Sequence, residues 1–390
     1  MSESHRYALV GGHTLLPHGL ETEAVVLIED GVIQSVGSET GHARVVDARG
    51  LHVLPGIVDL HGDAFERQLM PRPGVHFDMQ LALAETDRQL VANGITTAYH
   101  GVTYSWEPGL RGRDAMLQML IALDGAKPHL ACDTKLHLRQ ETYNLDGEEE
   151  VLSWLSEGKI ALLAFNDHLP DILRKLAQPH EVMNILQRTG LSAQDLHALA
   201  SRVAAREGEV KDSIRRLAGA AVSVGVAQAS HDDPSPDVRQ WYQDLGCGIS
   251  EFPKTKPTAA LARELGNHVV FGSPNVVRGG SHQKNAVAAA DMVSEGLCTV
   301  LTSDYYYPAM LPAAFRLANE ALCSFAQAWA MVSSNPADAA NLKDRGRLQA
   351  GLRADITLVK AAPGRSAHAV ASLIQGRVAY AGHGSPMGQP

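Results

Sequence analysis

The sequence predicts an α/β protein, a (β/α)8 TIM barrel with a small discontinuous β-sandwich-like domain built from both chain ends. Between residues 56 and 344, eight short apolar runs alternate with longer segments of helical periodicity, which is typical of repeated βα units. Residues 1–55 and 345–390 show no such periodicity, and their apolar and polar residues alternate between glycine turns. A length of 390 residues accommodates one barrel and one accessory domain.

The flanking domain is predicted from strands at both ends of the chain. Before residue 56 the strand-like segments are YALVGGHTLL, EAVVLIEDGVIQSVG and RVVDARGLHVLP. After residue 344, the segments RGRLQAGLRADITLV and SLIQGRVAYAG predict two or three further strands. We expect the two groups of strands to pair into one domain beside the barrel.

The eight barrel strands are predicted at GIVDLHGD, GITTAYHG, KLHLRQE, IALLAFNDH, AVSVGVAQASHDD, GISEFPKT, HVVFGSP and CTVLTSD. Helices are expected over about 79–93, over about 192–219 after Ser192 as N-cap, and from Pro257 to Gly266. Eight strand-like runs separated by helices favour a closed barrel over an open sheet.

Composition and charge exclude several classes of protein. A net charge of −9 gives no reason to expect a nucleic-acid or membrane-surface partner. No apolar run approaches the roughly 20 residues of a membrane span, and the N-terminus lacks the pattern of a signal peptide. The four cysteines are widely spaced and form no CxxC pair, which is typical of reduced thiols. We therefore expect a cytoplasmic protein whose partner is a small molecule; a homo-oligomeric state is left open.

Histidines and acidic residues end five of the eight predicted barrel strands. The chemistry of a (β/α)8 barrel lies at the C-terminal ends of its strands, and imidazole and carboxylate groups suit zinc or a similar divalent cation. A lone histidine after an apolar run is usually structural, but agreement among five runs predicts a metal site. The predicted ligands of one or two ions, expected to be zinc, are His61, Asp63, Glu141, His168 and His231, with Asp167 a rival to His168.

Two segments, LPGIVDLHGD and RGRLQAGLRADITLV, resemble the amidohydrolase superfamily, and the resemblance extends over essentially the whole chain. It implies a mono- or binuclear metal site in which Asp304, after the eighth strand, acts as acid and base. A narrower resemblance, to hydrolases of phosphonate utilisation in the carbon–phosphorus lyase pathway, rests on KLHLRQE, ASHDD, EFPKT, GSPNVVRGGSH and TSDYYYPA. It implies hydrolysis of α-D-ribose 1-methylphosphonate 5-triphosphate with release of diphosphate.

The first motif departs from that narrower pattern. The narrower pattern has His-Thr-Asp-Asn where this chain has His61-Gly62-Asp63-Ala64. The change keeps the histidine and aspartate ligands but alters the pocket wall beside them. A triphosphate also demands positive charge, and a pair of glycines after Arg278 allows backbone N–H groups to converge on an anion. The residues expected to bind the substrate are Arg67, Arg72, Arg139, Lys254, Arg278, Ser281 and His282.

Four other interpretations of these residues are open. The glycine pair is in most proteins an ordinary turn, and basic residues near Arg67 are equally consistent with a solvated surface. The same metal site also suits hydrolysis of a cyclic amide, an N-acyl group or a deaminable ring, since the site defines function and the fold does not. A scaffold that has lost its activity is the fourth, and retention of the strand-end ligands disfavours it.

Overall fold

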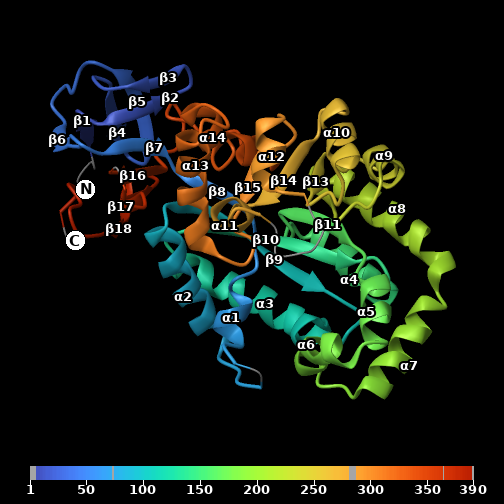
Figure 1. The fold of residues 1–390 in the computed structure, drawn as a ribbon. Coiled ribbons are helices and arrows are strands. Elements are labelled where there is room, and N and C mark those ends of the chain that lie inside the picture. The colour runs from blue at the N-terminus through green and yellow to red at the C-terminus, as the bar shows by residue number, and fades with distance from the viewer. Residues whose placement is uncertain (1–5, 73, 281–286, 363, 389–390) are drawn as a thin grey trace.

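Eight parallel strands form the barrel predicted from the sequence (Figure 1). The computed structural model describes residues 6–72, 74–280, 287–362 and 364–388. Each strand pairs with the next in chain order, and backbone hydrogen bonds between Asp63, Asp304 and His61 join the end of the last strand to the first. The strands are β8 (Ile57–Gly62), β9 (Ile95–Tyr104), β10 (Asp133–Glu141), β11 (Leu162–Asn166), β12 (Ala227–His231), β13 (Ile249–Glu251), β14 (His268–Gly272) and β15 (Val300–Thr302).

Helices surround the barrel and bury their apolar faces against it (Figure 1). Val58, Leu60 and Val270 belong to the apolar layer contributed by the strands themselves. The surrounding helices are α1 (Glu66–Leu69), α2 (Met79–Ala92), α3 (Arg113–Ala126), α4 (Glu148–Ser156), α8 (Glu207–Ser223), α9 (Pro236–Asp244), α10 (Lys256–Glu264), α11 (Ser273–Arg278), α12 (Ala289–Ser294), α13 (Met310–Asn319), α14 (Phe325–Ala330) and α15 (Ser334–Ala339).

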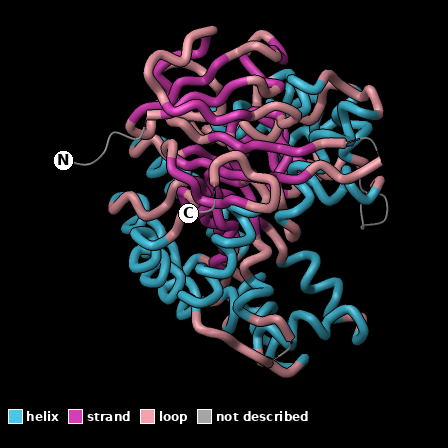
Figure 2. Tube along the Cα trace, turned by 90° about the vertical axis from the view of Figure 1, so that its left-hand side faces the viewer, coloured by secondary structure: helices cyan, strands magenta, loops and turns pink. Residues whose placement is uncertain are grey.

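Strands from both chain ends form two sheets beside the barrel, as Figure 2 shows in the upper half of its view. One sheet has the order β5-β4-β1-β6, and the other has the order β18-β17-β16-β7-β2-β3. Apolar residues of both sheets share one core, which gives the sandwich-like packing. The strands are β1 (Tyr7–Val10), β2 (His13–Leu16), β3 (Gly19–Glu21), β4 (Val25–Glu29), β5 (Val32–Gly37), β6 (Arg44–Asp47), β7 (His52–Pro55), β16 (Ile356–Lys360), β17 (His368–Ile374) and β18 (Arg377–Ala381).

A helical insertion follows β11 on the face of the barrel where the strands end. It consists of α5 (Leu169–Leu176), α6 (Pro179–Thr189) and α7 (Ala193–Ala204), which have a small apolar core of their own. The single helix expected over about 192–219 is therefore wrong, because the chain forms α7 and α8 with a break between them. Ser192 does cap α7, and its hydroxyl accepts the backbone N–H of Asp195.

Within the described ranges, no helix combines the length and the apolar character needed to cross a bilayer.

Candidate metal centre

Three imidazoles at the ends of β8, β11 and β12 lie in a row at the mouth of the barrel. The ring of His231 is 5.5 Å from that of His61 and 6.0 Å from that of His168, measured between centroids. Two groups of donor atoms, each within 4.8 Å of one another, share His231. One group adds His61 and Glu251, and the other adds His168 and Asp232. Three of the predicted ligands are thus brought together.

The two predicted acidic ligands, Asp63 and Glu141, lie beside this row and contact other members of the site. Glu141 Oε1 is 2.5 Å from His168 Nδ1, and its Oε2 accepts the backbone N–H of His168 at 3.2 Å. Burial acts to raise the pKa of Glu141, but His168 and Arg139 outweigh it and hold that pKa below its usual value. Asp63 Oδ2 lies 3.5 Å from Arg139 Nη1.

Arg139 was predicted to bind substrate, and the structure places its buried guanidinium among the metal-ligand candidates. Its Nη2 is 3.4 Å from His231 Nε2. With the amide oxygen of Asn166 facing the guanidinium, Asn166 accepts from Nη2 at 3.1 Å and from Nε at 3.2 Å. A planar cation in this position offers paired donors to a phosphate or a carboxylate.

Asp304 lies at the seam of the barrel, where its backbone joins β15 to β8. Its N–H donates to the carbonyl of His61 and its carbonyl accepts from Asp63 N–H, both at 2.9 Å. The residue has a φ of 54°, in the left-handed region that is costly for a residue other than glycine. Burial, together with the nearby charge of Asp63, raises the pKa of the Asp304 carboxyl to about 8.

Gly62 is a glycine because its surroundings leave no room for a side chain. A Cβ atom there would lie 2.8 Å from Ser303 Oγ, 2.8 Å from Tyr307 Cε1 and 2.9 Å from Asp59 Oδ2. Asp59 is fully buried and accepts the Ser303 backbone N–H at 3.0 Å and its hydroxyl at 2.5 Å. Gly62, which departs from the family pattern, therefore lies where the packing beneath the site is too tight for a side chain.

The predicted substrate-binding cations lie at different distances from these groups. Lys254 Nζ is 3.9 Å from Asp232 Oδ2, and Arg278 donates to the Tyr305 hydroxyl, one residue after Asp304. Burial raises the pKa of Asp63 to about 6, and the charge of Arg67, which is exposed on α1, acts weakly against this shift. Arg72 is exposed in the loop after α1 and has no ion pair among the described residues. Ser281 and His282 lie outside the described residues.

Glu251 is the site residue that the sequence reasoning missed. It ends β13, is fully buried, and its Oε1 lies 3.2 Å from His61 Nδ1. The rule that selected the other strand ends applies equally to GISEFPKT and would have found it. The carboxylate of Asp233, two residues after His231, accepts from Ser230 and Arg239, and Ser235 caps the following helix.

Further cations near the mouth were also missed. Arg111 donates to both oxygens of Glu66 at 3.2 and 3.0 Å, and Arg188 to both oxygens of Glu107 at 2.9 and 2.7 Å. Neither arginine belongs to a strand end, so the spacing of the sequence carried no indication of these pairs.

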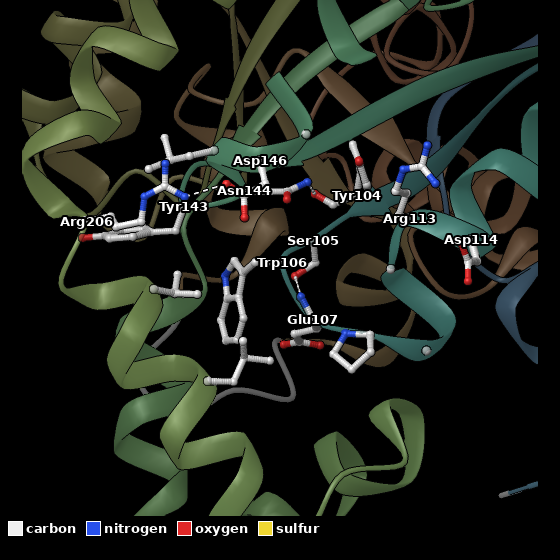
Figure 3. Close-up of a pocket in the computed structure, with 17 residues that line it drawn as sticks. Tyr104, Ser105, Trp106, Glu107, Arg113, Asp114, Tyr143, Asn144, Asp146 and Arg206 are labelled. Carbon is white, nitrogen blue, oxygen red and sulfur yellow. Dashed lines mark hydrogen bonds and ion pairs between the residues drawn. The ribbon is translucent and has the colours of Figure 1, made fainter. Parts of the chain in front are cut away.

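A cavity of about 460 Å3 lies beside the site, between the loops after β9 and β10 and helix α7 (Figure 3). In the figure Trp106 lies near its centre, with Tyr143 and Arg206 on one side and Arg113 on the other. Asn144 N–H donates to the carbonyl of Glu141 at 2.9 Å, so one wall of the cavity continues directly from a predicted ligand. The cavity is large enough for a small molecule or part of one.

The donor set fits a divalent cation. His231 Nδ1 and Glu251 Oε2 are buried and have no hydrogen-bond partner within the described part of the chain. Buried polar atoms are rarely left without a partner, and imidazole nitrogens with carboxylate oxygens are the ligands of zinc and related ions. The residues that could hold such an ion are His61, His168, His231, Asp232 and Glu251, with Asp63 and Glu141 beside them.

Comparisons with known proteins agree on one family. The model of the amidohydrolase family matches residues 251–380. The chain is 32% identical to alpha-D-ribose 1-methylphosphonate 5-triphosphate diphosphatase of Escherichia coli (strain K12) over 87% of this chain and 92% of that protein. Among solved structures, an amidohydrolase has a TM-score of 0.65 at 16% identity, with 97% of this chain and 100% of that chain covered.

N-acetylglucosamine-6-phosphate deacetylase from Pasteurella multocida has a TM-score of 0.66 at 11% identity, with 96% of this chain and 99% of that chain covered. At that identity the likeness concerns the fold alone. Sequence identity to the diphosphatase over most of both chains, together with the matching family model, shows the family of this chain. The chain belongs to the amidohydrolase family.

Proposed function

We propose that this hydrolase cleaves a phosphoanhydride bond of α-D-ribose 1-methylphosphonate 5-triphosphate and releases diphosphate. The observation that carries the proposal is the guanidinium of Arg139, buried among the imidazoles and carboxylates of the metal centre. A fixed cation there suits a polyanionic substrate better than a neutral amide. The extended identity to the diphosphatase of Escherichia coli supports the same substrate.

The residues divide into those that hold a metal and those that act on the substrate. His61, Asp63, Glu141, His168 and His231 would hold one or two ions, for which zinc is our choice. When bound, such an ion polarises phosphoryl oxygens and lowers the pKa of a bound water toward about 7. Arg139 binds a phosphoryl group, and Lys254, Arg278 and Arg67 at the mouth neutralise the remaining charge.

In its ionised form, Asp304 accepts the proton of the attacking water. A bond forms between the water oxygen and phosphorus, the anhydride P–O bond breaks, and diphosphate leaves with its electron pair. The position of Asp304 at the seam between β15 and β8 places its carboxyl next to Asp63. All four cysteines are free thiols, which agrees with a reducing compartment, and we place the enzyme in the cytoplasm.

Diphosphate release from the ribosyl triphosphate tests the proposal, with a nucleoside triphosphate as a cheaper probe. We expect release that is lost with a chelator and restored by zinc. Asp304→Asn should lower kcat by about 100- to 10,000-fold, whereas Asp212→Asn, on the exposed face of α8, should leave it unchanged. Hydrolysis of cyclic amides or N-acyl compounds without any diphosphate release would overturn the substrate assignment.

A further inference from the structure

Glu251 lies between two histidines beneath the mouth of the barrel. Its Oε1 is 3.2 Å from Nδ1 of His61, and its Oε2 is 3.8 Å from Nε2 of His137. All three side chains are almost fully buried. The two rings meet edge to face, with centroids 5.1 Å apart. A buried carboxylate is costly unless its neighbours stabilise the charge, so this arrangement requires an explanation.

The hydrogen bonds fix which ring nitrogens carry protons. The carbonyl of Leu60 can only accept, so His137 Nδ1, at 2.9 Å from it, is protonated. A carboxylate oxygen likewise accepts, and His61 therefore carries its proton on Nδ1 and has a free electron pair on Nε2.

The free nitrogen of His61 borders the space beside the stem of Arg139. A Cβ built on Gly101 would lie 3.5 Å from His61 Nε2 and 3.3 Å from Arg139 Cδ, so the ring edge and the arginine stem border the same space. From there the guanidinium of Arg139 extends to Asp63 and His231. Nε2 is consequently the nitrogen placed to ligate an ion.

We propose that Glu251 is a positioning residue of the metal centre, which fixes the ring orientation and tautomer of His61 through Nδ1. A carboxylate behind a ligating histidine raises the basicity of the ligand and restricts its rotation, and loss of such a partner weakens metal binding by about 10- to 100-fold. The inference rests on the metal centre of the proposed function but not on the identity of the substrate.

Metal affinity of Glu251→Gln, measured by competition with a chelator for zinc, tests the role. Glutamine keeps the volume and one acceptor oxygen but removes the charge. We expect zinc affinity about 10- to 100-fold below wild type with the same number of bound ions. The cobalt-substituted variant should keep the visible absorption bands of the wild type, because the ligands themselves are unchanged.

Two further variants distinguish positioning from a purely structural role. Asp87→Asn removes another buried carboxylate, one that accepts the backbone N–H of Cys132, and should lower thermal stability without changing zinc affinity. Glu251→Asp keeps the charge and should bind zinc more tightly than Glu251→Gln.

Zinc affinity equal to wild type in Glu251→Gln would overturn the proposal. So would loss of one bound ion or shifted cobalt bands, since either would make Glu251 a direct ligand. These measurements use no substrate. If the wild type failed to release diphosphate, the proposed substrate would be lost, but the result on Glu251 would stand.

Discussion

Gly62 connects the identity of one residue to the shape of the site. It separates His61 and Asp63, whose side chains face the mouth, while its own missing side chain leaves space for Ser303, Tyr307 and Asp59. The threonine of the related pattern would place Cβ within 3 Å of all three. The exchange is therefore a packing requirement of this chain.

Gly62→Thr should destabilise the protein by about 1 to 3 kcal/mol, because overpacking a filled core forces neighbours to move. Urea unfolding of the metal-free protein measures the effect without interference from ligand binding. Gly219→Ala is the matched control: no atom lies within 4 Å of its added Cβ on helix α8, so it should stabilise by about 0.5 to 1 kcal/mol. Equal stability of Gly62→Thr and wild type would show that Tyr307 and Ser303 can give way.

The insertion α5–α7 is the element that the local sequence describes least well. Leu196 of α7 packs with Ile172 and Ile185 of the insertion, whereas Ile214 of α8 packs in the cluster with the barrel strands. The helical periodicity is nearly continuous across both, so the sequence predicts one helix. The helix breaks because α7 packs on the insertion and α8 packs on the barrel. Helical periodicity carries no information about which partner a helix packs against.

Glu107, which is 3% exposed, anchors this insertion by accepting two hydrogen bonds from Arg188 of α6. Arg188→Met leaves that carboxylate buried without its cation, and we expect a loss of about 3 kcal/mol. Hydrogen exchange should accelerate over residues 169–204 more than in the barrel strands. Arg174→Met, which removes exposed pairs with Asp171 and Glu181, is the control and should cost less than about 1 kcal/mol. Uniform acceleration across the whole chain would contradict local anchoring.

The strand ends show what the sequence could predict of the site. The eight apolar runs all form barrel strands, because a parallel sheet covered by helices gives continuous apolar segments whose ends share one face. This rule brings His61, His168 and His231 together. Side-chain pairs across elements, such as Glu66 with Arg111, depend on loop paths that have no local pattern. Glu251 followed the rule but was not recognised.

At the scale of the whole molecule, a charged cluster joins the N-terminal side of the barrel to the flanking domain. Arg345 is 5% exposed and donates to Asp133 at 2.5 Å and to Thr97 at 2.9 Å. Arg353, just before β16, lies 3.4 Å from the same carboxylate. Asp133 begins β10, so it connects the barrel directly to the C-terminal segment that completes the second domain.

Asp133 should make the stability of the protein depend on pH. Burial acts to raise its pKa, but Lys135, Arg345 and Arg353 outweigh burial and hold the pKa below its ordinary value. Its contribution is therefore present above the unfolded pKa, near 3.9, and is lost as the pH falls through the lower folded pKa.

Asp133→Asn should cost about 1 to 2 kcal/mol at pH 7 and progressively less below about pH 4, as measured by urea unfolding across the pH range. Asp212→Asn, at an exposed pair with Arg215, should change stability by only a few tenths of a kcal/mol at any pH. A difference for Asp133→Asn that does not change with pH would contradict an electrostatic origin.

The seam between β8 and β15 has a consequence for the order in which the enzyme is made. Asp63 N–H donates to the carbonyl of Asp304 across this seam, and Asp304 N–H donates to the carbonyl of His61, although 241 residues separate Asp63 from Asp304 along the chain. A ribosome must therefore synthesise nearly the whole barrel before His61 and Asp63, the predicted ligands, meet Asp304, the proposed acid and base. We therefore expect metal binding to follow completion of the chain, and a protein truncated before residue 304 to contain His61 and Asp63 without Asp304.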